Sequence, residues 1–265
     1  LAYTVGRLVV TTLDNDARHE LLPGHTMVHF DLSADDQHIV FASGSDEDAR
    51  RGIWIAPLDL TAAPRRVFNG ETERVFFDRS ENIYFLQRSG GQRHLHRLRA
   101  PDYKVNERAY PDRARYLFAA SPDGEWIVGV TDRPDGRGWQ QLAISTRGLP
   151  PRVICGTCGG GAGPARVMAP ALSWTRDGHA LLISGQLVAG GYGMFGPPST
   201  IVIPVQPGAA LPDLGPSGIT SVEDYLRLPG ARKIPRQNVL PGATPDQLFF
   251  YETTTIRNLY RVRLP

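Results

Sequence analysis

A short turn signature recurs five times along the chain and constrains the fold more than any other feature of the sequence. Its clearest copy, Ser-Pro-Asp-Gly at residues 121–124, lies between two short apolar runs. Proline presets φ at the second turn position, aspartate hydrogen-bonds to the neighbouring backbone, and glycine accepts a positive φ. Because the flanking runs are rich in β-forming residues, the pattern predicts two antiparallel strands joined by a tight turn.

The five copies recur at the spacing of a repeated structural unit. Aligned on an acidic turn residue, they are 46, 42, 54 and 69 residues apart, at Asp35, Glu81, Asp123, Asp177 and Asp246. A third strand is expected after each hairpin, at residues 53–56, 94–98, 141–144, 201–203 and 259–262. A short fourth strand is expected at residues 65–68, 107–110 and 152–154. Four antiparallel strands per repeat, with this period, predict an all-β propeller of four-stranded blades.

The same residues carry a family resemblance. The turns, Ile-Trp-Ile at residues 53–55 and Arg-Arg-Val at residues 65–67 resemble the TolB-like (WD-repeat-like) β-propeller repeats. Residues 154–159 and 257–265 resemble the extracytoplasmic C-terminal propeller regions of bacterial eukaryotic-type Ser/Thr kinases or winged-helix regulators. This resemblance implies the fold for nearly the whole chain, and a role in sensing or protein interaction within a larger signalling protein. The repeat itself is shared by proteins of many functions.

We expect one propeller domain over residues 1–265. Its blades are placed at about residues 1–26, 27–70, 71–112, 113–168, 169–230 and 231–265, and the first and last are incomplete. Strands near residues 8–10 and 259–262 pair if the ring has five blades. A six-bladed ring, which the resemblance favours, needs a further segment upstream. A short helix is expected at residues 221–228, because a Thr-x-x-Glu capping pair precedes it and Pro-Gly follows it.

Composition and missing motifs exclude several functions. The 29 basic and 27 acidic residues give a net charge of +2, which makes no case for nucleic acid or an anionic membrane as partner. No apolar run reaches the ~18 residues of a membrane span, so any signal peptide or anchor would lie upstream. Nucleophile-elbow, phosphate-loop and kinase motifs are absent from the sequence. We therefore expect no catalytic residues, no cofactor and no enzymatic activity.

Cys155 and Cys158 are the only cysteines, and their spacing leaves three interpretations open: free thiols or a structural clip, a redox disulfide, or two ligands of a metal. Zinc would need two further ligands, and the histidines supply no spaced pair for it. His94 and His96 share one strand face but are typical of a solvated blade. We keep the cysteines as a redox or disulfide candidate and expect no metal site.

The loops between second and third strands are expected to meet at one end of the propeller. They carry seven arginines and six acids, a mixed surface that suits a protein or peptide partner. A glycine-rich loop at residues 186–198 adds two aromatic residues there. The predicted partner-binding residues are Arg50, Arg51, Arg133, Arg137, Tyr192 and Phe195. The sequence thus favours a non-catalytic sensor or interaction propeller; the alternatives are a propeller that gates a hydrolase and one that binds a small ligand or metal in its channel.

Overall fold

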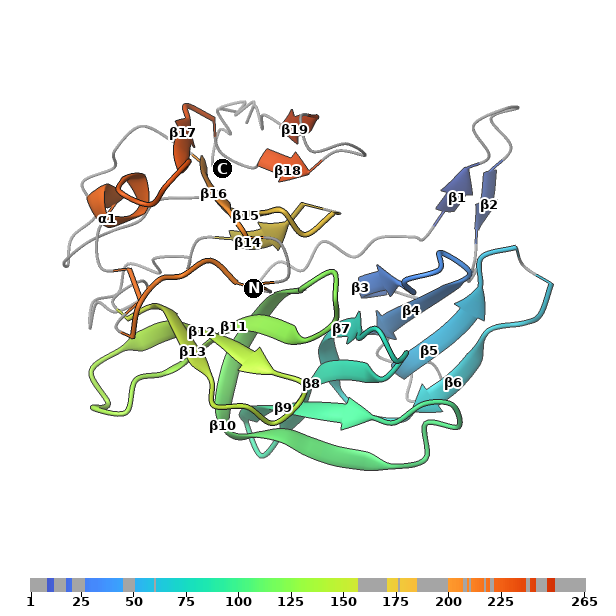
Figure 1. Cartoon of the computed structure of the whole chain (residues 1–265). Coiled ribbons are helices and arrows are strands. Elements are labelled where there is room, and N and C mark those ends of the chain that lie inside the picture. The colour runs from blue at the N-terminus through green and yellow to red at the C-terminus, as the bar shows by residue number, and fades with distance from the viewer. Residues whose placement is uncertain are drawn as a thin grey trace, which may run out of the picture.

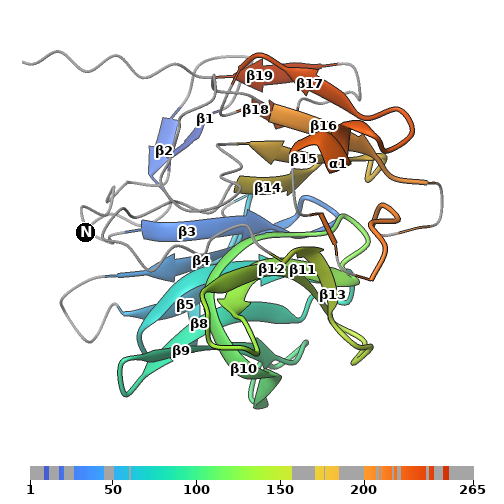
Figure 2. The same cartoon turned by 90° about the vertical axis from the view of Figure 1, so that its left-hand side faces the viewer.

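The computed structural model is almost entirely built of antiparallel strands. It describes residues 9–11, 18–20, 27–44, 51–59, 61–156, 171–175, 177–184, 200–206, 209, 211–216, 218–219, 222–236, 239–241 and 247–250. Figure 1 shows the sheets following one another around an arc, from β3–β6 on the right through β7–β10 at the bottom to β14–β17 at the upper left. In Figure 2 the strands of this last sheet lie at the top and β9 and β10 at the bottom.

The first two complete sheets have the strand order expected of blades. Blade A consists of β3 (Met27–Leu32), β4 (His38–Ser43), β5 (Gly52–Pro57) and β6 (Arg65–Phe68). Blade B consists of β7 (Thr72–Phe77), β8 (Ile83–Ser89), β9 (Gln92–Leu98) and the first part of β10 (Asn106–Ala120). In both, each strand pairs antiparallel with the next one along the chain.

One strand belongs to two blades. β10 pairs with β9 through residues 106–113 and with β11 (Trp126–Asp132) through residues 114–120. Its ladder is irregular around Pro111, which has no amide hydrogen to donate. Blade C therefore consists of the second part of β10, β11, β12 (Trp139–Ser145) and β13 (Arg152–Cys155). The outer strand of blade B thus continues directly into the inner strand of blade C.

Blade D extends further along the chain than its expected end at Gly230. It consists of β14 (Ala171–Trp174), β15 (Ala180–Ser184), β16 (Thr200–Pro204) and β17 (Arg232–Ile234), which pairs with β16. The boundary was placed too early because a long connection, containing helix α1 (Val222–Leu226), separates the third strand from the fourth. The helix ends at Leu226, and the Pro-Gly pair at residues 229–230 follows it in a turn without ending the blade.

Two further hairpins are described at the ends of the chain. β1 (Val9–Thr11) pairs with β2 (Arg18–Glu20), and β18 (Val239–Pro241) pairs with β19 (Leu248–Phe250). β1 agrees with the strand expected near residues 8–10, and the β18–β19 hairpin agrees with the fifth copy of the repeated turn. The expected strand at residues 259–262 lies outside the described residues, so the closure of the ring and the number of blades stay predictions.

The hydrophobic core is divided into clusters between successive blades. Blades A and B enclose one around Val40, Ile53, Val75 and Phe85. Blades B and C enclose a second, with Tyr84, Leu86 and Ile127. A third joins blades C and D and includes Tyr225 of α1, while Leu182, Val202 and Val239 pack between blade D and the β18–β19 hairpin. Each blade is therefore stabilised mainly by burying its apolar faces against its neighbours.

Two polar side chains on the inner strand of blade A bind the inner strand of blade B. The amide of Phe77 donates to Asp31 Oδ2 at 2.9 Å, and the amide of Val75 donates to His29 Nδ1 at 3.4 Å. These two bonds satisfy amides on the edge of β7 that pairs with no strand in the described part of the chain. Burial raises the pKa of Asp31 to about 6, and burial with the nearby Arg74 guanidinium lowers the pKa of His29 to about 4.

Three of the repeated turns are held by the same hydrogen bonds. A hydroxyl donates to the turn acid from Ser33 to Asp35 (2.5 Å), Ser121 to Asp123 (2.5 Å) and Thr175 to Asp177 (2.6 Å). The same carboxylate oxygen accepts the amide two residues further on, at 3.0 Å in each copy. These bonds lower the pKa of Asp35 and Asp177 and explain why the signature recurs as Ser/Thr-x-Asp.

The second copy is built differently, and the alignment of Glu81 with the turn aspartates is wrong. Asp78 closes this turn, since its Oδ1 accepts the amides of Ser80 (2.8 Å) and Asn82 (2.9 Å). Glu81 has φ of 60° and so stands where other copies have Asp36 (56°), Gly124 (68°) and Gly178 (74°). Its carboxylate is therefore not needed by its own turn.

Candidate functional site

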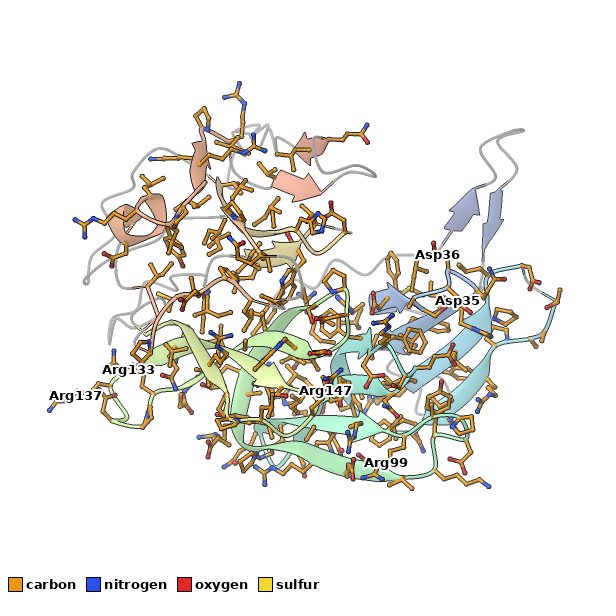
Figure 3. The ribbon with its side chains drawn as sticks, viewed as in Figure 1. Asp35, Asp36, Arg99, Arg133, Arg137 and Arg147 are labelled. Carbon is orange, nitrogen blue, oxygen red and sulfur yellow. The ribbon has the colours of Figure 1, made fainter. Side chains whose placement is uncertain are left out.

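The loops joining second and third strands lie at one end of the blades, which we call the loop end; the repeated turns lie at the other, the turn end. At the loop end β8 and β9 are joined through Gly90 and Gly91, whose positive φ values of 57° and 76° suit a two-residue hairpin turn. The β11–β12 loop, residues 133–138, is longer. Figure 3 shows Arg133 and Arg137 of this loop on the left, opposite Asp35 of the turn end.

Most described arginines of the loop end are paired within the chain. Arg88 binds Glu71 at 3.0 Å, and Arg93 binds Glu73 at 2.8 Å. The first pair is well exposed, with side-chain exposures of 43% and 48%, so it contributes about 1 kcal/mol or less to stability. These pairs nevertheless neutralise the local charge and hold the β8–β9 hairpin against the start of β7.

Arg133, a predicted partner-binding residue, is bound inside the chain. Its guanidinium binds both carboxylate oxygens of Asp135, at 3.1 and 2.7 Å, in the bidentate geometry that arginine favours. The remaining nitrogen, Nη1, donates to the carbonyl of Gly156 at 2.9 Å. Arg133 therefore ties the β11–β12 loop to the segment that follows β13, and its donors are directed away from a partner.

Arg137 differs from these arginines. Its backbone amide donates to Asp135 at 2.9 Å, but its exposed guanidinium forms no hydrogen bond or ion pair with the residues that the structure describes. Figure 3 places it at the outer edge of the loop. Arg51, also predicted to bind a partner, is half-buried immediately before β5. The other predicted residues, Arg50, Tyr192 and Phe195, lie outside the described residues.

A half-buried tryptophan two positions after Arg137 was not predicted from the sequence as a site residue. Trp139 opens β12, and the Arg115 guanidinium stacks over its ring at 4.9 Å while binding Asp132. Asp132 faces Trp139 directly across the β11–β12 pair. We call Arg115, Asp132, Arg137 and Trp139 the β12 patch. In the sequence, Arg137 and the tryptophan that follows the loop point to this patch, whereas Arg115 joins it from another strand and gives no local signal.

Cys155 ends the outer strand of blade C and is fully buried. It is disulfide-bonded, so its sulfur is not a free thiolate that could bind a metal. Cys158 lies outside the described residues. The connection between β16 and β17 of blade D returns to this end of β13. There Ile219 forms an isolated parallel β-bridge with Cys155, and the Ile219 amide donates to the Ile154 carbonyl at 2.9 Å. Gly218 approaches so closely that a Cβ would lie 2.7 Å from that same carbonyl oxygen.

The His94 and His96 rings contact different neighbours and are not directed at one common metal position. His96 Nδ1 lies 2.9 Å from Asn106 Oδ1, and His94 lies against the Arg108 guanidinium, a cation that would repel a bound metal ion. Each ring contacts the neighbouring part of β10 separately. The pair therefore belongs to the polar surface between β9 and β10.

Two further observations limit the functions that the described residues could perform. A surface pocket of about 360 Å³ lies beside the outer edge of β13 and is lined by Pro151, Arg152, Val153, Asp213, Gly215 and Pro216. Its walls carry no nucleophile and no histidine. Among the described residues, no helix has the length and apolar character needed to cross a bilayer.

Comparison with known proteins adds a distant relative by sequence. No protein-family model matches the chain. It is 31% identical over 224 residues to the WD-repeat protein coronin-7 of Bos taurus, covering 74% of this chain and 23% of the coronin. The chain thus spans less than a quarter of that relative's length.

Several solved structures share the fold. They include a putative TolB from Agrobacterium tumefaciens, with a TM-score of 0.57 and 13% identity over 82% of this chain and 73% of that one. TolB from Acinetobacter baumannii has a TM-score of 0.51 and 14% identity over 75% and 46%. Oligogalacturonate lyase from Vibrio parahaemolyticus also reaches 0.51, with 9% identity over 75% and 57%. At these identities the likeness concerns the fold alone. The chain has the β-propeller fold of TolB-like and WD-repeat proteins.

Proposed function

We propose that this chain is a non-catalytic interaction propeller that binds a protein or peptide through the β12 patch at its loop end. We further propose that it serves as the sensing or scaffolding part of a larger signalling protein. The observation that carries the proposal is the exposed guanidinium of Arg137, which forms no hydrogen bond or ion pair with the described residues and lies two positions before the half-buried Trp139.

The composition of the patch supports this role. Tryptophan and arginine dominate the energetics of protein interfaces, because each buries a large surface and forms directional contacts. Asp132 and Arg115 hold the Trp139 ring, so little side-chain freedom would be lost on binding. The patch is built on a strand pair, which keeps its geometry rigid.

A catalytic role has less support, although oligogalacturonate lyase shares the fold. The Ser33 hydroxyl bonds to the backbone amide and carbonyl of His38 and not to its ring, so this pair is not a nucleophile with its base. The one described cysteine is disulfide-bonded. Gating of a hydrolase and binding of a small ligand in the channel stay as alternatives, and no particular contact favours them.

The proposal is tested by capturing partners from the native source and then titrating the purified partner with variants. We expect Trp139→Ala to weaken binding by about 2 kcal/mol, or about 30-fold, as at other interface hot spots. Arg137→Glu should slow association and weaken its dependence on salt, because it reverses a rim charge. Arg147→Ala is the matched control, since it removes an exposed, ion-paired arginine at the turn end.

If Trp139→Ala and Arg137→Glu bind as tightly as the native chain but Arg147→Ala does not bind, the interface lies at the turn end and the proposed β12 patch is wrong. Turnover of a substrate by the purified chain would contradict the non-catalytic part of the proposal.

A further inference from the structure

Three side chains with metal-binding atoms converge at the turn end, between blades A and B. They are Asp35, from the turn joining β3 and β4, His38, the first residue of β4, and Glu81, from the turn joining β7 and β8. One carboxylate oxygen from each acid and one ring nitrogen of His38 lie within 4.8 Å of one another. These residues are up to 46 positions apart in the chain, and the packing of two blades brings them together.

The converging atoms are available to a ligand. Asp35 uses Oδ1 in its own turn, accepting from Ser33 and from the amide of Gln37, which leaves Oδ2 without a described donor. Neither the His38 ring nor the Glu81 carboxylate forms a hydrogen bond with any residue in the described part of the chain. His38 and Glu81 are half-buried, and Asp35 is exposed, so the cluster is open to solvent on one side.

Glu81 departs from the repeat in a way that its own turn does not explain. At this left-handed position two other copies have glycine, Gly124 and Gly178, and one has Asp36. A non-glycine residue there costs about 1 kcal/mol or more. Asp78 already closes the turn, so the Glu81 side chain is free to reach the preceding blade.

The donor set selects a class of metal. One imidazole nitrogen and two carboxylate oxygens suit Zn²⁺ or another divalent first-row transition metal, since Mg²⁺ and Ca²⁺ favour oxygen ligands alone. Three protein ligands leave positions open to water or to a donor from a partner. A bound dication would also balance two carboxylates that lie close together.

We propose that Asp35, His38 and Glu81 form a divalent transition-metal site that links blades A and B at the turn end. The site is separate from the β12 patch, so it does not depend on the proposed partner binding. The proposal concerns binding and linkage of the two blades and includes no chemical step.

The test uses the metal-stripped full chain and Zn²⁺ alone, measured by isothermal titration calorimetry and by thermal unfolding. We expect one Zn²⁺ per chain and a rise in melting temperature on its addition. Glu81→Gly is the informative variant, because glycine occupies the equivalent position in two other copies. It should fold at least as stably as the native chain without metal, yet lose at least 10-fold in affinity and most of the zinc-dependent rise.

Two further variants make the result decisive. His38→Ala should also abolish uptake, whereas Asp102→Asn, which removes an exposed carboxylate elsewhere at the turn end, should leave it unchanged. Absence of uptake at 100-fold molar excess of Zn²⁺ would overturn the proposal. So would uptake that persists in both Glu81→Gly and His38→Ala. Equal affinity for Ca²⁺, unaffected by His38→Ala, would overturn the choice of metal.

Discussion

The pH dependence of stability should reveal the contacts that join the inner strands of blades A and B. Asp31 has its pKa raised from 3.8 to about 6, so between these values the folded chain binds its proton more tightly than the unfolded chain does. Asp31 therefore favours folding more strongly as the pH falls from 6 to 3.8. His29 has its pKa lowered from 6.5 to about 4. Its contribution to the free energy of unfolding is therefore lost as the pH falls from 6.5 to 4.

The two effects have similar size and opposite sign. Each pKa unit corresponds to about 1.4 kcal/mol, so each residue changes the free energy of unfolding by about 3 kcal/mol across its range. In the native chain they nearly cancel. Asp31→Asn keeps an oxygen that can accept the Phe77 amide and removes only the carboxylate titration. Between pH 4 and pH 7, its stability relative to the native chain should therefore rise by about 3 kcal/mol.

Urea unfolding of the native chain, Asp31→Asn and His29→Asn at half-unit pH steps would measure this. The difference between His29→Asn and the native chain should slope the other way, because that variant keeps only the Asp31 titration. Parallel stability curves for Asp31→Asn and the native chain would refute the argument, since Asp31 would then titrate alike in the folded and unfolded chains.

Two further substitutions test the packing between blades. The hydroxyl of the fully buried Tyr225 has no hydrogen-bond partner among the described residues, and burial raises its pKa, so Tyr225→Phe should stabilise the fold by about 1 kcal/mol in urea unfolding. A loss of stability would contradict this and reveal a partner for the hydroxyl. Gly124→Ala should lower the free energy of unfolding by about 3 kcal/mol or more, because the new Cβ would lie 2.1 Å from the Arg79 amide nitrogen. Gly136 has the same φ of 68° but open space around it, so Gly136→Ala should cost only about 1 kcal/mol. Equal losses in the two alanine variants would contradict the close approach of blades B and C.

The repeated turns could be predicted because their residues are required locally. Proline, aspartate and glycine act within a few positions of one another, so the sequence alone revealed Ser121–Asp123 and Thr175–Asp177 as turns. Glu81 was misaligned because an acid near a turn looks the same in sequence whether or not it closes that turn. Asp78 does so here, and only the hydrogen bonds distinguish the two.

The contacts between strands and blades could not be predicted in the same way. Arg115 reaches Trp139 because β10 and β12 lie on either side of β11, which depends on register. His29 and Asp31 find their donors in the next blade, 46 residues away. β17 was assigned to the following blade because the long connection before it broke the regular period. Such relations depend on tertiary packing, which a local pattern does not encode.

Hydrogen–deuterium exchange of the chain, with and without its captured partner, locates the interface on the molecule. We expect slower exchange on binding at residues 132–139, across the β11–β12 loop and the start of β12, with no change at residues 146–151 of the turn end. Protection confined to residues 146–151, with residues 132–139 exchanging as in the free chain, would contradict it.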